Sequence, residues 1–104
     1  GHTFQLHHQC FHGGGRIMLT FVLQGGGTRR RPFRQRRHTQ VAGRVLDIAG
    51  RIVRSLHTGT LPAGESVWSW DGRTDAGTRA GAGVYLCVVH ASGETRGIKI
   101  YRVR

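Results

Sequence analysis

The chain has 104 residues, of which 16 are Lys or Arg and five are Asp or Glu, so its formal net charge is +11. This length suffices for one hydrophobic core and excludes a multidomain enzyme. No apolar run approaches the roughly 20 residues of a membrane-spanning helix, so we expect no membrane span. The chain begins at Gly1 without a methionine or a signal sequence, and we therefore expect a fragment of a longer precursor with any export signal upstream.

The charge is distributed unevenly along the chain. All five acidic residues lie after residue 46, and 15 of the 16 cations are arginine, with Lys99 as the exception. Such a bias arises from a GC-rich genome as readily as from selection for phosphate binding. Charge alone therefore assigns no partner.

Short strand-like runs separated by turn residues make up most of the chain, and no segment keeps helical periodicity over three turns. The predicted strands cover residues 3–8, 17–23, 40–48, 51–57, 66–70, 83–91 and 96–103. Glycine, aspartate and proline mark the turns between the later strands. Seven such strands predict an all-β fold, an antiparallel β-sandwich.

Residues 24–40 differ in kind from the strand-like runs. They contain six arginines and one aromatic residue, Phe33, without the alternation that would let one face be buried, so we interpret them as a solvated loop. The alternative is nucleic-acid or polyanion binding, in which guanidinium groups neutralise phosphates and Phe33 stacks on a base. The arginines concerned are Arg29, Arg30, Arg31, Arg34, Arg36 and Arg37. A single interleaved aromatic favours the loop, with weak polyanion binding expected at low salt.

Four short motifs follow one another from residue 45. Val-Leu-Asp-Ile-Ala-Gly-Arg-Ile-Val occupies 45–53, Leu-Pro-Ala-Gly leads to Trp-Asp-Gly-Arg within 61–73, Gly-Ala-Gly-Val-Tyr covers 81–85, and a basic, apolar run ends the chain at 98–104. In this order they resemble the immunoglobulin-like domain of the flagellar hook-capping protein FlgD and the related C-terminal sorting domains of exported bacterial proteins. The resemblance covers residues 41–104 and implies an immunoglobulin-like sandwich.

The first forty residues follow the family pattern less closely. Phe4–Gln9 and Leu19–Leu23 match the ends of a phrase that opens many members, whereas residues 10–40 depart from it. An insertion and a locally altered reading frame both remain open as explanations. We therefore divide the chain into N-terminal strands of the sandwich over 1–23, an Arg-rich loop or insertion over 24–40 and a FlgD-like core over 41–104.

Elementary chemistry gives the motif residues architectural roles. Asp47 and Gly50 bracket a tight hairpin, in which the carboxylate accepts backbone N–H bonds and glycine takes the left-handed conformation. Trp68 and Trp70 are two apart on one strand, so they point to the same face and anchor the core. The predicted structural residues are Asp47, Gly50, Arg51, Gly64, Trp68, Trp70, Asp71, Gly72, Gly83 and Tyr85.

The last strand carries the functional expectation. Its residues are Ile98, Lys99, Ile100, Tyr101, Arg102, Val103 and Arg104. The apolar residues are expected to hold the strand to the sheet, while Lys99, Arg102 and Arg104 supply charge. By resemblance to the sorting domains this strand is recognised by a type IX-like secretion apparatus, and by resemblance to FlgD it is a subunit contact in a flagellar cap. A purely structural role, completing the sandwich, is equally open.

The resemblance therefore implies a non-catalytic C-terminal module for sorting, attachment or assembly of an exported bacterial protein. Its implied location is the cell surface or the outside of the cell. The implied partner is the secretion or cell-surface assembly machinery.

Metal and disulfide chemistry receive little support from the spacing of ligands. His8, Cys10 and His12 alternate and would share one face of a strand, but no fourth ligand is placed by the spacing, so incidental histidines are favoured over a metal site. Cys10 and Cys87 permit one disulfide, yet nothing places the two sulfurs together, and free thiols are favoured.

Catalytic motifs are equally weak. Asp71 and Asp75 lie among turn glycines, which favours turn formation over a pair of catalytic carboxylates. No catalytic triad order or phosphate-binding loop can be argued from the sequence. We therefore predict no cofactor, no metal site and no enzymatic activity.

Overall fold

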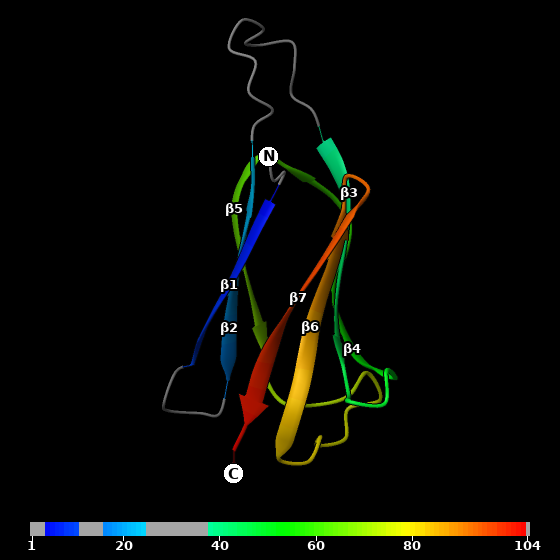
Figure 1. The fold of residues 1–104 in the computed structure, drawn as a ribbon. Helices are drawn as coiled ribbons and strands as arrows, with labels where there is room; N and C mark the ends of the chain where they lie inside the picture. The colour runs from blue at the N-terminus through cyan, green and yellow to red at the C-terminus, as the bar shows by residue number, and fades with distance from the viewer. Residues whose placement is uncertain (1–3, 11–15, 25–37, 104) are drawn as a thin grey trace, which may run out of the picture.

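The computed structural model describes residues 4–10, 16–24 and 38–103, with the backbone alone for 8–10, and contains seven strands in two antiparallel sheets (Figure 1). The strands are β1 (Phe4–Cys10), β2 (Ile17–Leu23), β3 (His38–Leu46), β4 (Ile52–Pro62), β5 (Gly64–Trp70), β6 (Gly83–Ala91) and β7 (Glu94–Arg102). One sheet has the order β1-β2-β5 and the other β4-β3-β6-β7. The sheets form the two layers of a sandwich, so the predicted all-β fold is confirmed. Within the described ranges no helix is long and apolar enough to span a membrane.

Burial alternates along the central strand of the three-stranded sheet. Every second side chain of β2 from Ile17 to Leu23 is buried, and the residues between them are half-buried. β2 pairs along its whole length with β1 on one side and β5 on the other. This register places Leu19 opposite Trp68 and Ile17 opposite Trp70, so both tryptophans face the second sheet together with the apolar row of β2.

β6 is an interior strand of the four-stranded sheet, between β3 and β7. Its inward residues Tyr85, Cys87 and Val89 are buried, and the two residues between them are half-buried on the outer face. Coverage by two neighbouring strands and by the facing sheet explains why its sequence is apolar on both faces. The hairpin to β7 turns at Ser92 and Gly93, which have φ values of 52° and 75°.

Aromatic rings occupy the centre of the core. Phe4, Phe21 and Trp70 are fully buried. The Phe21 ring centroid lies 5.3 Å from that of Phe4 and 5.2 Å from that of Trp68. Because each such residue buries roughly 150–250 Å², these rings supply much of the hydrophobic stabilisation.

β1 and β2 complete the core from the N-terminal side. Of the 15 buried hydrophobic residues in the described part of the chain, five lie on these strands: Phe4, Ile17, Leu19, Phe21 and Leu23. The sandwich therefore needs residues from both sides of the Arg-rich segment 24–40. Removing β1 and β2 would uncover the inner face of the four-stranded sheet.

β4 is longer than the sequence predicted. The predicted strand ended at residue 57, whereas β4 continues to Pro62 because residues 58–62 keep pairing with residues 38–42 of β3. The chain then leaves the four-stranded sheet and enters the other one at Gly64, whose φ is 120°. The Leu-Pro-Ala-Gly motif at 61–64 thus forms the crossing between the two sheets.

Candidate recognition surface

Asp47 organises the turn between β3 and β4. Its Oδ1 accepts hydrogen bonds from the N–H groups of Ala49 and Arg51, both at 2.9 Å, and its Oδ2 lies 3.2 Å from Arg51 Nε. The backbone hydrogen bond from Arg51 is the main cause of the lowered pKa of the Asp47 carboxyl, with smaller contributions from Ala49 and the Arg51 charge. Gly50 has φ 88°, the left-handed conformation expected for this turn. The polar groups of the turn are therefore satisfied within it.

Trp68 packs across the sandwich onto Gly43 of β3. A Cβ atom on Gly43 would overlap the six-membered ring of the indole, so a glycine is required here for close approach. The indole also stacks on Phe21 and on His57 of β4, whose ring centroids lie 5.2 Å and 5.6 Å away. Trp68 therefore joins β2 and β5 to the β3–β4 side of the other sheet.

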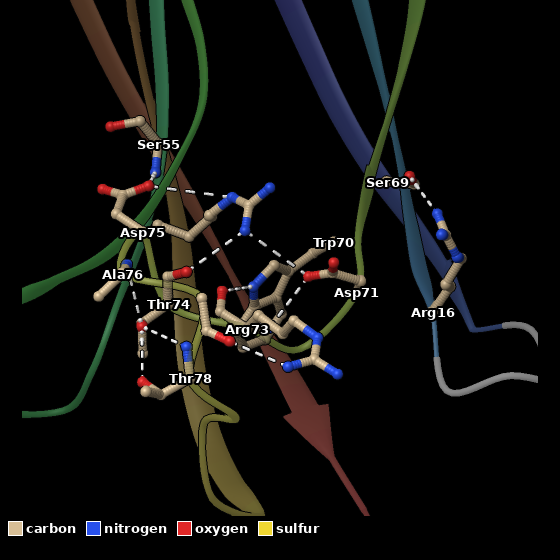
Figure 2. Close-up of polar contacts among 12 residues, drawn as sticks. Arg16, Ser55, Ser69, Trp70, Asp71, Arg73, Thr74, Asp75, Ala76 and Thr78 are labelled. Atoms are coloured by element: carbon tan, nitrogen blue, oxygen red, sulfur yellow. Dashed lines mark hydrogen bonds and ion pairs between the residues drawn. The ribbon is translucent and has the colours of Figure 1, made fainter.

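Trp70 fixes the connection that follows β5 (Figure 2). Its indole Nε1 donates a 2.9 Å hydrogen bond to the carbonyl oxygen of Arg73. Tyr85 packs edge-on against Trp70 with ring centroids 5.1 Å apart, and its hydroxyl donates to the carbonyl oxygen of Gly81 at 2.7 Å. The two rings thus fill the core while their polar atoms hold both ends of the connection.

Asp75 caps the free edge of β4. Its N–H donates to the carbonyl oxygen of Val53 at 2.9 Å, and its Oδ1 accepts the Ser55 N–H at 3.0 Å (Figure 2). Arg54 lies between the two aspartates, with guanidinium nitrogens 3.7 Å from Asp71 Oδ1 and 3.9 Å from Asp75 Oδ1. Each carboxylate also accepts a backbone hydrogen bond. Asp71 and Asp75 therefore hold the connection between β5 and β6 against the edge of β4.

β7 is the opposite edge of the four-stranded sheet. Ile98 is half-buried and Ile100 fully buried against the core, whereas Lys99 and Tyr101 alternate with them and are exposed on the outer face. Beyond the strand, Val103 is also exposed, and Arg104 lies outside the described residues.

Arg102 is placed differently from its neighbour Lys99. Its guanidinium packs over Gly72, where an added Cβ would meet Arg102 nitrogen and carbon atoms at 2.6–2.7 Å. Gly72 itself has φ 82° and is buried. Arg102 was expected to offer charge to a partner, but its half-buried side chain instead covers the turn after Trp70. Lys99 is therefore the exposed cation of β7.

The remaining predicted residues are less informative. Gly64 and Gly83 have positive φ values of 120° and 147° and are exposed. The arginines from Arg29 to Arg37 lie outside the described residues, as does His12, and the side chains of His8 and Cys10 are not described. In the part of the chain that the structure describes, no three His, Cys, Asp or Glu side chains gather into a group able to hold a metal ion.

Cys87 is a free, buried thiol on β6. Its burial raises the pKa of the thiol to about 12, because the thiolate would lose its hydration. The protonated form is a poor nucleophile and a poor metal ligand. Cys87 thus acts as a small apolar residue of the core.

Comparison with known proteins identifies the family of this sandwich. Residues 34–95 match the family model described as the FlgD Ig-like domain. The chain belongs to this family. The predicted resemblance to the FlgD immunoglobulin-like domain is confirmed over residues 34–95, which contain the first three of the four motifs, and the sandwich is immunoglobulin-like.

Two curated relatives are the basal-body rod modification protein FlgD of Salmonella typhimurium strain LT2 and that of Salmonella typhi. Each is 38% identical to this chain over 53 residues, which is 51% of this chain and 23% of the relative. The match therefore spans about a quarter of the length of these relatives. The family match ends one residue after β7 begins, and it starts after β2 has ended.

Two of the structurally engaged residues were missed by the sequence analysis. Gly43 lies in the middle of a predicted strand, where an interior glycine signals close approach of another group. That signal was present but did not name Trp68 as the group. Arg54 carried no signal, because its pairing with Asp71 and Asp75 depends on a connection that folds back onto β4.

Proposed function

We propose that this domain is a non-catalytic module by which an exported bacterial protein is sorted, attached or assembled at the cell surface, and that β7 is the strand its partner recognises. The partner class is the secretion or cell-surface assembly machinery. Membership in the FlgD Ig-like family supports an assembly role, since the curated relatives are named as rod modification proteins of the basal body. The carboxylates of Asp71 and Asp75 are already engaged in turn and edge contacts, which supports a role without catalysis.

The observation that carries this proposal is the difference between the two edges of the four-stranded sheet. The edge of β4 is capped by Asp75, which takes up backbone groups of Val53 and Ser55. No comparable backbone hydrogen bond from outside the sheet reaches β7 within residues 4–10, 16–24 and 38–103. An uncapped edge strand can pair with a strand of another protein, and the exposed Lys99 can steer an acidic partner toward it.

The test is surface display of a secreted reporter in a bacterial host with a type IX apparatus. The reporter should carry all 104 residues, because β1 and β2 supply part of the core. We expect display with the intact domain and reduced display with Lys99→Gln combined with Tyr101→Ser. Arg16→Gln, which removes an exposed cation next to β2 of the other sheet, is the matched control and should display normally.

Equal display with the domain absent, intact or carrying the β7 substitutions would leave β7 with only its structural role. Circular dichroism and thermal melting of each variant distinguish a lost contact from a lost fold. The same set of variants can be scored for incorporation into flagellar basal bodies in a flagellated host, which separates a flagellar role from a sorting role.

A further inference from the structure

The outer face of the four-stranded sheet gathers apolar side chains at one end. Six large apolar side chains are exposed in the described part of the chain, and five of them belong to this sheet, its β3–β4 turn or the residue after β7: Ile48, Ile52, Val84, Tyr101 and Val103. The turn between β3 and β4, the beginning of β6 and the end of β7 all lie at the same end of the sandwich (Figure 1). The sixth, Val67, lies on the other sheet.

Strand register makes these side chains neighbours. Leu46 of β3 pairs with Ile52 of β4 on one side and with Leu86 of β6 on the other. Val84, two residues before Leu86 on the same face, pairs with Tyr101 of β7. We call Leu46, Ile52, Val84, Leu86 and Tyr101 the outer patch. Isolated exposed apolar residues are ordinary, but a contiguous patch of this kind marks an interaction surface.

Within the described residues, the charges beside the outer patch that form no ion pair are cations. Lys99 pairs with Leu86, and Arg44 lies two residues before Leu46 on the outer face; neither forms an ion pair within the described residues. The carboxylate of Asp47, which follows Leu46 in the sequence, accepts backbone hydrogen bonds within the β3–β4 turn. Asp75 lies at the edge of β4 beside Val53, the neighbour of Ile52, but its carboxylate is engaged by the Ser55 N–H and by Arg54. Asp71 is likewise paired with Arg54, and the other two acids lie on β5 and at the inward-facing start of β7. The patch is thus apolar with cations along it.

We propose that the outer patch, together with Lys99 and Arg44, docks a protein surface that has an apolar centre and acidic residues around it. This inference rests on the proposed function for the identity of the partner, the assembly machinery, and it extends the contact from the edge of β7 to the adjoining face of the sheet. Positive charge beside the patch disfavours a second copy of this chain, because the same cations would face each other. A sheet face with two cations and half-buried aliphatic groups suits a protein better than a lipid surface.

The probe for the surface is bis-ANS, a dye that combines aromatic rings with sulfonate groups and so matches apolar and anionic recognition. It is titrated into the folded 104-residue chain and into Val84→Ser, Lys99→Gln and Val67→Ser. Val67 is 56% exposed and serves as the matched control on the other sheet. We expect saturable binding that weakens by about fivefold or more in Val84→Ser and in Lys99→Gln, and that is unchanged in Val67→Ser. Absent binding, or an equal loss in all three variants, overturns the inference.

Other occupants give distinct results. Cosedimentation with vesicles of phosphatidylcholine and phosphatidylglycerol that is lost in Val84→Ser would assign the patch to a lipid surface and overturn the proposal. Dimerisation in sedimentation velocity that is lost in Val84→Ser would assign it to a second copy, with the same consequence. We expect neither.

The reporter assay separates this inference from the proposed function. Display that persists with Val84→Ser would overturn docking on the face, because Val84 belongs to the outer patch but not to β7. The Lys99→Gln, Tyr101→Ser variant tests the proposed function, since the edge of β7 and the outer patch share these two residues. Display that is independent of the whole domain would refute the proposed function, while the dye titration still decides whether the outer patch is a binding surface. We expect display to fall with Val84→Ser and to be retained with Val67→Ser.

Discussion

Gly43→Ala tests the packing between the two sheets most sharply. The added Cβ would overlap the indole of Trp68, which is held on its faces by Phe21 and His57 and cannot move without disturbing them. Overpacking of this kind costs about 1–3 kcal/mol, offset by about 0.5–1 kcal/mol because alanine loses less conformational freedom than glycine. The free energy of unfolding should therefore fall by about 1–2 kcal/mol.

Gly97→Ala is the matched control, because its Cβ would make only ordinary contacts, 3.5 Å from the Cys87 carbonyl oxygen and 3.6 Å from Val88 Cγ2. Thermal melting followed by tryptophan fluorescence measures both variants. A domain of this size loses about 4–8 °C in Tm per kcal/mol, so Gly43→Ala should melt several degrees below the parent and Gly97→Ala close to it. A Gly43→Ala variant as stable as Gly97→Ala would refute the close approach of Trp68.

Three further predictions follow from buried and engaged groups. Trp70→Ala should lower the free energy of unfolding by about 3–5 kcal/mol, because it leaves a cavity at a fully buried site. A melting temperature within a couple of degrees of the parent would show that Trp70 does not belong to the core. Asp47→Asn should lower the free energy of unfolding above pH 3.8, where Asp47 is ionised in both the folded and the unfolded state. Because the folded pKa lies below 3.8, the difference in free energy between variant and parent should vanish as the pH falls through the folded pKa. A difference that persists in acid would exclude the carboxylate charge as its cause. In a Cys10→Ser background, Cys87 should react with a thiol reagent only as fast as the protein opens, whereas rapid labelling of the native protein would contradict its burial.

The alternation of apolar residues was sufficient to locate the strands. The predicted bounds of 17–23 and 83–91 coincide with β2 and β6, because these strands are mostly apolar and are bounded by glycine or polar residues. β4 was cut short at 57 because Thr58, Gly59 and Thr60 carry a weak apolar signal, and pairing with β3 extends the strand past them. Such pairing is a tertiary effect that a local pattern does not contain.

The contacts that define the candidate site were harder to predict. The turn at Asp47 depends on residues within four positions, and its chemistry was readable from the sequence. The packing of Arg102 over Gly72 joins residues 30 positions apart, so the sequence suggested an exposed charge where the structure has a half-buried one. The outer patch likewise combines residues of four strands, and only the strand register shows that they adjoin.

Site-specific photocrosslinking tests the central claim, that the β7 end of the four-stranded sheet contacts the assembly machinery. A photoreactive phenylalanine analogue is placed at Tyr101 or, as a control of equal exposure, at Val67, in the full chain fused to the displayed reporter. The account predicts a crosslink to an envelope protein from position 101 and not from position 67. An excess of free parent domain should compete it away, and free Lys99→Gln domain should compete poorly. Equal crosslinking from both positions, or competition that ignores Lys99, would contradict recognition through β7.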